Sequence, residues 1–227
     1  MVSASQILFG TLSLLSPTLA LPTNPLVLES RQTVNLPITL TAYAPDNTNL
    51  NGAKAQNGGS LFGEQVAQYC PTIVGDSCPN GTETVYWGGL TPSSMVPGGQ
   101  DLYVSADGSI HITVQHSHYI PSDAYPSYQG WVYNTLPSAN DTDPAPMPNC
   151  PLDDPRYNCD TPMGYYTFHA PDAPADVGGV VSCPYLDSPD HFSAYAVTPN
   201  FNRTDCTPML GLGSHHYTGV NPPVWAY

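Results

Sequence analysis

Two histidines separated by one residue are the clearest candidate metal ligands in the chain. His116 and His118 flank a serine, and alternate residues of a β-strand share a face, so both imidazoles could reach one ion. The residues that could complete such a site are His111, Asp190, His191, His215 and His216. However, a strand continuing from Ile110 would place both histidines on an apolar face, and no helical H-E-x-x-H motif is present. We therefore expect these histidines to be structural, with no metal and no other cofactor.

Carboxylates offer a second kind of chemistry. Glycoside hydrolysis needs two of them about 5 to 10 Å apart, one with a raised pKa. Beyond residue 31 the chain has only the glutamates Glu64 and Glu83, so aspartates would have to contribute. The available ones are Asp101, Asp107, Asp123, Asp187 and Asp190. Most of these adjoin Gly, Pro or Ser, as solvated turn residues do. A secreted hydrolase that uses Asp or His is thus an alternative, but not the favoured one.

Nucleophilic catalysis has little support in the sequence. No G-x-S-x-G element is present, and the stretch 213–215 (Gly-Ser-His) lacks the second glycine. A copper oxygenase with an N-terminal histidine brace would need His as its first mature residue. Cleavage after Ala20 would expose Leu21, and cleavage after Arg31 would expose Gln32. We expect no catalytic residues and no enzyme.

A group of aromatic residues could instead form a platform for sugar rings. Tyr119, Tyr125, Tyr128 and Trp131 lie close together in the sequence, among Pro and Ser residues. Exposed rings of this kind stack on sugars, while nearby Asn and Asp side chains bind hydroxyl groups. The alternative is that Trp131 and Tyr133, on one face of a strand, belong to the core and that the loop tyrosines cover it.

The start of the chain has the pattern of a secretory signal. Residues 7–20 form an apolar run that ends in the small residues Thr18 and Ala20. The run is too short, and too soon interrupted by Pro17, to span a membrane comfortably. Residues 1–20 are thus the expected signal peptide, and residues 21–31 are either a short propeptide cut after Arg31 or a disordered leader. We expect a secreted protein, extracellular or in the cell wall.

Six cysteines behind a signal peptide favour disulfides over metal thiolates. They form three sequence-local pairs that each flank a turn-rich segment: Cys70 with Cys78, Cys150 with Cys159, and Cys183 with Cys206. We expect these three bridges. Sequons for N-glycosylation begin at Asn80, Asn140 and Asn202, and we expect surface glycosylation.

The hydrophobic pattern predicts β-strands. Residues 34–43 alternate apolar and polar side chains with a period of two, and Pro37 suits an edge or the start of a strand. Further strands are expected at 84–87, 130–133, 165–169, 179–183, 192–197 and 223–227. Short strands between Pro and Gly turns indicate a compact all-β sandwich or barrel of antiparallel strands, with a β-trefoil as the alternative.

A β-hairpin is predicted around Asp107-Gly108, with strands at 102–104 and 110–114, because Asp-Gly supplies the positive φ of a tight turn. By contrast, residues 137–163 contain seven prolines and five aspartates, which exclude a regular strand or helix. We expect a surface loop there, held by Cys150 and Cys159, within a single all-β domain of residues 32–227.

The charge balance argues against anionic partners. The chain has four Lys and Arg against 18 Asp and Glu, for a formal net charge of −14. Phosphate binding needs a basic surface, so neither nucleic acid nor an anionic membrane is an expected partner. Wall polysaccharide and wall glycoproteins are the partners that suit an acidic extracellular protein.

Several short motifs occur in an order that resembles one known family. They are Tyr69–Pro71, Gly81–Val85, Val96–Val104, Asp107-Gly108, Gln115–Ile120, Gly164–Phe168, Ser182–Pro184 and the region of Cys206. Spanning residues 36–227, they resemble small secreted ascomycete proteins labelled IgE-binding proteins, which are related to a cell-wall protein of phialide and conidium development. The resemblance implies a secreted or wall-associated, non-catalytic β protein, and the loop at 137–163 departs from it.

The sequence therefore predicts a secreted, disulfide-bonded fungal glycoprotein with a structural or interaction role at the cell wall. A carbohydrate-binding module is the runner-up, with Tyr119, Tyr125, Tyr128 and Trp131 as the candidate glycan contacts.

Overall fold

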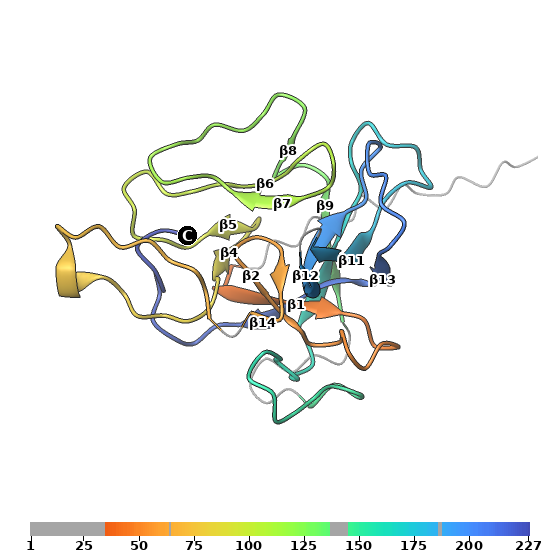
Figure 1. The fold of residues 1–227 in the computed structure, drawn as a ribbon, viewed down its shortest axis with the longest axis horizontal. Coiled ribbons are helices and arrows are strands. Elements are labelled where there is room, and N and C mark those ends of the chain that lie inside the picture. The colour runs from red at the N-terminus through yellow and green to blue at the C-terminus, as the bar shows by residue number, and fades with distance from the viewer. Residues whose placement is uncertain (1–34, 64, 137–144, 186–187) are drawn as a thin grey trace, which may run out of the picture. The chain divides into compact units, whose positions relative to one another are not determined.

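The computed structural model describes residues 35–63, 65–136, 145–185 and 188–227, without the side chains of 188–190. These residues contain no α-helix (Figure 1). Their elements are β1 (Ile38–Tyr43), β2 (Lys54–Gln56), β3 (Ser60–Leu61), the 3-10 turn η1 (Gly75–Ser77), β4 (Tyr86–Trp87), β5 (Thr91–Pro92), β6 (Leu102–Val104), β7 (Ile110–Ile112), β8 (Tyr125–Pro126), β9 (Trp131–Thr135), β10 (Gly164–Phe168), β11 (Val180–Tyr185), β12 (Ser188–Ala196), β13 (Thr207–Met209) and β14 (Gly211–His216). The signal peptide, the leader, Glu64, Asn140, Asp187 and the Asp190 side chain lie outside this description.

The strands form two antiparallel sheets, which confirms the predicted fold class. The larger sheet has 11 strands in the order β13-β11-β12-β3-β2-β1-β14-β10-β9, with β4 and β5 branching from β1. The smaller sheet, β7-β6-β8, lies beside it (Figure 1). The large sheet follows one continuous path rather than three repeated hairpin units, so the β-trefoil alternative was wrong.

The alternation predicted for residues 34–43 is realised in β1, which begins directly after Pro37. Ile38, Leu40 and Ala42 are at most 2% exposed and face the core. The other face carries threonines and Tyr43. β1 pairs with β14 along its whole length and with β2 at Leu40 and Thr41, so it lies inside the sheet. The strand pattern therefore located a central element.

The other central strand, β14, was not expected from the sequence. Its residues, Gly-Leu-Gly-Ser-His-His, include no β-branched or aromatic side chain, which is why the pattern failed there. Glycine fits in β14 because neighbouring segments of the same chain leave little room for a side chain there. A Cβ atom on Gly213 would lie 3.1 Å from Oγ1 of Thr41 and 3.2 Å from the ring of Pro162.

The predicted hairpin is present, but it is shorter than expected. Val104 pairs with Ile110 and Leu102 with Ile112, and Gly108 at the tip has a φ of 92°. The second strand ends at Ile112 instead of Val114, because Val114 is 67% exposed and His116 turns the chain with a φ of 62°. Residues 223–227 likewise form isolated bridges, Ser94 to Val224 and Tyr69 to Ala226, and not the expected strand.

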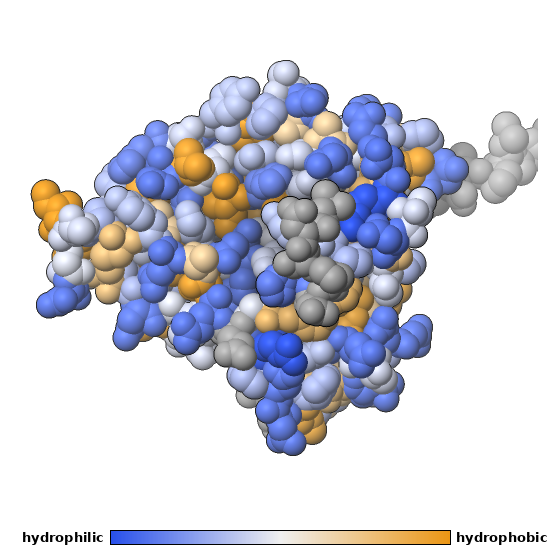
Figure 2. Space-filling view, in the orientation of Figure 1, coloured by the Kyte–Doolittle hydropathy of each residue, from blue (hydrophilic) through white to orange (hydrophobic). Residues whose placement is uncertain are grey.

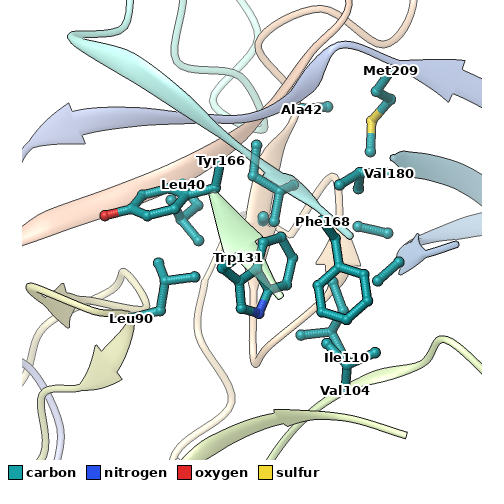
Figure 3. Close-up of a cluster of buried hydrophobic side chains, with 14 of the residues drawn as sticks. Leu40, Ala42, Leu90, Val104, Ile110, Trp131, Tyr166, Phe168, Val180 and Met209 are labelled. Carbon is teal, nitrogen blue, oxygen red and sulfur yellow. The ribbon is translucent and has the colours of Figure 1, made fainter. Parts of the chain in front are cut away.

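The core lies between the large sheet and the hairpin (Figure 3). Phe168 is 1% exposed, and its ring makes an edge contact with Trp131 at 5.2 Å. Val104 and Ile110 of the hairpin lie next to the same ring in Figure 3. Burial of these large side chains contributes to the hydrophobic stabilisation of the fold.

The three predicted disulfides are confirmed. Cys70 binds Cys78, Cys150 binds Cys159, and Cys183 binds Cys206, with Cα separations of 6.2, 5.5 and 4.2 Å. The described residues contain no free cysteine. They also include no helix long and apolar enough to cross a membrane.

Candidate functional site

The two candidate metal-binding histidines do not share a strand face. His116 lies in a turn after β7, and the Nδ1 atom of His118 lies 2.6 Å from Oδ2 of Asp101 at the surface. Among the described residues, no group of three His, Cys, Asp or Glu side chains is placed to hold an ion. The strand continuation that would have aligned the histidines is absent because β7 ends early.

Two of the four predicted glycan contacts are buried, which corrects that prediction. Trp131 is 7% and Tyr125 9% exposed, and both rings pack edge-on against Phe168. The Tyr125 hydroxyl donates to Asp172, and burial together with that carboxylate raises the pKa of Tyr125 to about 12. Tyr119 and Tyr128 are exposed, at 75% and 70%. The four residues therefore form no common platform.

Two further catalytic candidates, Asp107 and Ser214, have local structural partners. Asp107 accepts hydrogen bonds from the backbone and the hydroxyl group of Ser109, which closes the hairpin loop. Ser214 is completely buried, and its hydroxyl donates to the carbonyl of Gly164. A buried serine held in this way is not available as a nucleophile. Of the sequon asparagines, Asn80 and Asn202 are exposed, as N-glycosylation requires.

A groove of about 460 Å³ lies on the outer side of β1 and β2. We call it the tyrosine groove, because Tyr157 and Tyr217 line it together with Lys54, Glu83, Asn158 and Asp160. Its residues come from five separate parts of the chain: β1, β2, the segment before β4, the 150–160 loop, and the end of β14 with the segment that follows it. A cavity of this size is in the usual range for small ligands.

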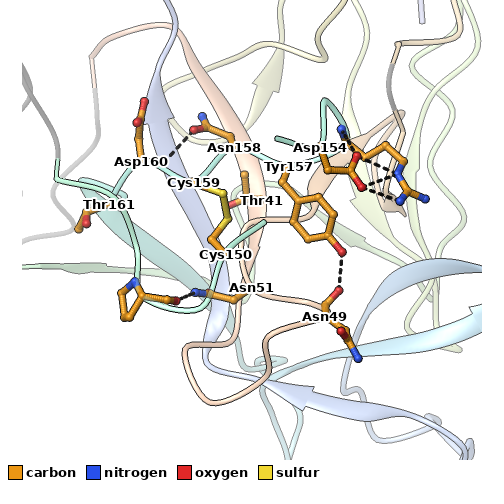
Figure 4. The surroundings of a disulfide bond; sticks show 12 residues. Thr41, Asn49, Asn51, Cys150, Asp154, Tyr157, Asn158, Cys159, Asp160 and Thr161 are labelled. Carbon is orange, nitrogen blue, oxygen red and sulfur yellow. Dashed lines mark hydrogen bonds and ion pairs between the residues drawn. A yellow bond between two sulfur atoms is a disulfide. The ribbon is translucent and has the colours of Figure 1, made fainter. Parts of the chain in front are cut away.

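The loop at 145–161 contributes Leu152 and residues 157–160 to the groove, and Figure 4 shows the surroundings of its disulfide. The backbone of Lys54 donates to Arg156, that of Asn158 donates to Gly52, and Ala53 bridges Tyr157, so the loop runs antiparallel to residues 52–54. Gly52 is required at this junction. Its φ is 85°, and a Cβ atom there would lie 2.5 Å from Sγ of Cys150.

Hydrogen bonds of two polar side chains, those of Asn51 and Tyr157, attach the 145–161 loop to residues 49–51. The fully buried Asn51 donates its amide to the Pro148 carbonyl at 3.3 Å. The Tyr157 hydroxyl donates to the Asn49 carbonyl at 2.8 Å, and in Figure 4 its ring points toward Asn49. The predicted surface loop is therefore, in its described part, an ordered wall attached to the sheet.

An ion pair crosses the groove. Nζ of Lys54 lies 2.8 Å from Oε1 of Glu83, and both side chains are about one-fifth exposed. The other oxygen of Glu83 accepts from Nε2 of Gln56 at 3.1 Å. Gln56 is 1% exposed and also accepts from the backbone of Thr84 at 2.6 Å, which fixes residues 82–84 against β2. Both oxygens of Glu83 are thus engaged inside the protein.

Tyr217 lies beside this ion pair. Partial burial raises the pKa of Tyr217, and the nearby Glu83 carboxylate raises it further. The Tyr217 hydroxyl lies directly over Gly219, where a Cβ atom would collide with it. On the opposite wall, burial raises the pKa of Tyr157, and its ring packs edge-on against Phe62 at 5.7 Å. The Tyr157 ring is therefore held in place, and the Tyr217 ring lies against Gly219.

Beneath the groove, Thr41 and His215 are both buried. Oγ1 of Thr41 lies 2.9 Å from Nε2 of His215, and their residues are 1% and 5% exposed. Among the described residues no carboxylate pairs with the imidazole, and burial lowers the pKa of His215 to about 4. This histidine is structural and supports the floor.

The site has no free positive charge. Each Lys or Arg in the described residues has a carboxylate partner: Lys54 with Glu83, Arg156 with Asp154 and Arg203 with Asp205. Figure 2 shows one face of the molecule, where hydrophilic residues dominate and apolar groups form small, separate areas. The groove is thus suited to a polar ligand that is not anionic.

Sequence reasoning missed the tyrosine groove because its residues are scattered from 39 to 219. The one available signal was the Pro/Asp-rich loop itself, with its own disulfide. That loop departs from the family resemblance, and it supplies Tyr157, Asn158 and Asp160.

One known protein provides a comparison over most of the chain. An uncharacterized secreted protein of Arthroderma benhamiae is 30% identical over 197 residues, which are 84% of this chain and 85% of that protein. No protein-family model matches the chain, and no solved structure matches it.

Proposed function

This chain belongs to the same family as the secreted protein of Arthroderma benhamiae, and from that premise we propose that it acts at the fungal cell wall. Its role there is to bind a wall polysaccharide through the tyrosine groove without cleaving it. The motif resemblance to IgE-binding-type proteins and to the phialide and conidium wall protein supports the wall location. In this proposal the protein is an interaction protein, and no residue is catalytic.

The observation that carries the proposal is the composition of the groove. Two tyrosine rings line it together with amide, carboxylate and hydroxyl groups of Asn158, Asp160 and Thr218. Aromatic faces cover the apolar C–H surface of sugar rings, and polar groups bind the hydroxyls. The described cations are all paired with acids, which favours a neutral polymer over an anionic one.

The arrangement of carboxylates supports binding over catalysis. Glu83 already accepts hydrogen bonds from Lys54 and Gln56 on its two oxygens. A glycosidase needs one carboxyl group free to give a proton and another free to attack or to activate water. Asp160 is exposed at the rim of the groove. We therefore expect binding without release of soluble sugars.

The experiment is a pull-down of the secreted protein on insoluble β-glucan, chitin and purified fungal wall. Wild-type protein should remain with at least one of them, and Tyr217→Ala should reduce the bound fraction at least fivefold, because the ring supplies contact area. The matched control is Tyr119→Ala, which removes an equally large but distant exposed ring. Equal loss in both variants, or release of reducing sugar by wild type, would contradict the proposal.

A further inference from the structure

A second cavity, of about 260 Å³, opens where the small sheet meets the large one. We call it the Asn57 pocket; it is lined by Asn57, Ser60, His111, Tyr185, Ser193 and Tyr195. The β2–β3 hairpin, β7, the end of β11 and β12 supply these residues, and an isolated antiparallel bridge joins Ser109 to Tyr195 at its side. None of the lining residues belongs to the tyrosine groove.

The pocket contains an unsatisfied hydrogen-bond acceptor. Oδ1 of Asn57 is buried and has no hydrogen-bond partner among the described residues. The Asn57 backbone is fixed, because its N–H donates to Oγ1 of Thr84 at 2.8 Å and its φ is 50°. A buried acceptor without a donor is costly. Because this oxygen has almost no accessible surface, a ligand hydroxyl supplies the missing donor once the Asn57 side chain turns its oxygen toward the pocket.

Three rings lie in the pocket walls, those of His111, Tyr185 and Tyr195. The guanidinium of Arg203 lies 5.2 Å from the centre of the Tyr195 ring, and Phe201 packs against that ring at 6.2 Å. The imidazole of His111 stacks on Tyr103 with centroids 5.3 Å apart. Tyr185 is 52% exposed. The Tyr195 and His111 rings are already packed against neighbours, so they lose little conformational freedom when a ligand binds.

The charges near the pocket disfavour an anion. The cation beside it, Arg203, is held by Asp205 and by the carbonyl of Pro184. Burial lowers the pKa of His111, although the nearby Asp107 carboxylate opposes this effect. At neutral pH the imidazole is therefore uncharged and can both donate and accept hydrogen bonds. The hydroxyl groups of Ser60 and Ser193 add further polar contacts.

We infer that the Asn57 pocket binds one neutral pyranose ring, a terminal or side-chain sugar residue of a saccharide. The Tyr195 and His111 rings and the side chain of Ile110 take its C–H face, and Asn57, Ser60 and Ser193 take its hydroxyls. This inference does not depend on the tyrosine groove. If both sites bind, a single molecule can hold two saccharide chains.

The test is an NMR titration of the secreted protein with methyl glycosides of glucose, mannose, galactose and N-acetylglucosamine, up to millimolar concentrations. At least one should bind saturably and shift the signals of residues 57–60 and 193–195. Glucose 6-phosphate is the charge control and should bind at least tenfold more weakly than the matching neutral sugar, because the cation beside the pocket, Arg203, is already paired with Asp205.

Two variants at one position separate a binding role from a structural one. Asn57→Gly keeps the left-handed backbone and deletes the amide, so affinity should fall at least tenfold. Asn57→Asp keeps an acceptor oxygen and should retain affinity within about threefold. Tyr217→Ala should leave this binding unchanged. The inference is overturned if no neutral glycoside binds, if the phosphate binds better, or if Asn57→Gly lowers the melting temperature but not the affinity.

Discussion

At the level of single residues, His215 gives the fold a defined pH dependence. Burial lowers its pKa from an ordinary value of 6.5 to about 4. Between about pH 6.5 and about pH 4, the His215 imidazole therefore binds a proton in the unfolded chain but not in the folded protein. The contribution of His215 to the free energy of unfolding is fully present above about pH 6.5 and is lost as the pH falls from about 6.5 to about 4. At about 1.4 kcal/mol per pKa unit, the loss amounts to about 3 kcal/mol.

The measurement is urea unfolding of wild type and His215→Gln at several pH values in this window. Glutamine can still donate to Thr41 but does not titrate, so the variant should show a flatter profile. Asp154 and Asp205 have lowered pKa values, so their contributions to stability change only below their ordinary pKa of 3.8, which is outside the pH window of His215. Parallel profiles for the two proteins would refute the assignment of the effect to His215.

A second residue-scale prediction concerns the hairpin tip. Gly108 has a φ of 92°, its Cβ position collides with the carbonyl of Ala196, and Phe201 lies 3.0 Å away. Gly108→Val should therefore destabilise the protein by about 3 kcal/mol or more, through backbone strain and displacement of β12. Gly89→Val is the matched control, since Gly89 has a φ of 76° but no neighbour within 4 Å. Thermal melts should show a clearly larger loss for Gly108→Val; equal losses would mean that the contact with β12 is not needed.

The aromatic residues show why a site is harder to predict than its residue types. Tyr125 and Trp131 have the composition of a sugar platform, yet they pack against Phe168, which is 37 residues beyond Trp131 in the sequence. The rings that do line a groove, Tyr157 and Tyr217, are 60 residues apart. They line the same groove only because the 145–161 loop pairs with residues 52–54, and the local sequence does not specify that pairing.

At the level of elements, the Cys150–Cys159 bridge should matter more for binding than for folding. It closes a short loop, so its loss costs up to about 3 kcal/mol in the chain-entropy model. It also frees the groove wall that carries Tyr157, Asn158 and Asp160. We predict that Cys150→Ala with Cys159→Ala lowers the wall-bound fraction at least fivefold, measured by the same pull-down.

The Cys70–Cys78 bridge provides the matched control. Its sequence separation is 8 against 9 for Cys150–Cys159, so the entropic cost of removal is similar. No residue of its loop lines the groove. Cys70→Ala with Cys78→Ala should therefore lower the melting temperature by a similar amount and leave binding unchanged. Loss of binding in this control would mean that the groove responds to general stability.

The strands differ in how well the sequence specifies them. β1 and the β6–β7 hairpin alternate clearly, and both were predicted within a few residues. β14 is central but glycine-rich, and its strand conformation is imposed by the backbones of β1 and β10 on either side. β3, β4, β5 and β8 have two residues each, too few for any period to appear. Tertiary pairing decides such elements, and local propensity does not.

At the level of the whole molecule, the net charge of −14 allows the proposed ligand class to be tested by salt. Binding of a neutral polysaccharide releases no counterions, so the bound fraction should change less than about twofold from about 0.05 to about 0.5 M NaCl. Polylysine beads are the control, because an acidic protein should bind them at low salt and leave them at high salt. A wall-bound fraction that also falls steeply with salt would point to an electrostatic partner instead.

The central claim, that the tyrosine groove binds a neutral wall saccharide, is tested most directly by mapping the contact. Isotope-labelled protein is titrated with soluble oligosaccharides of the polymer that retains it, and backbone amide shifts are followed by NMR. Saturable shifts are expected at Asn158, Asp160 and residues 217–219, and they should be lost in Gly219→Ala because that methyl group displaces the Tyr217 ring. Saturable shifts that exclude these residues, or equal shifts in Gly219→Ala, would contradict it.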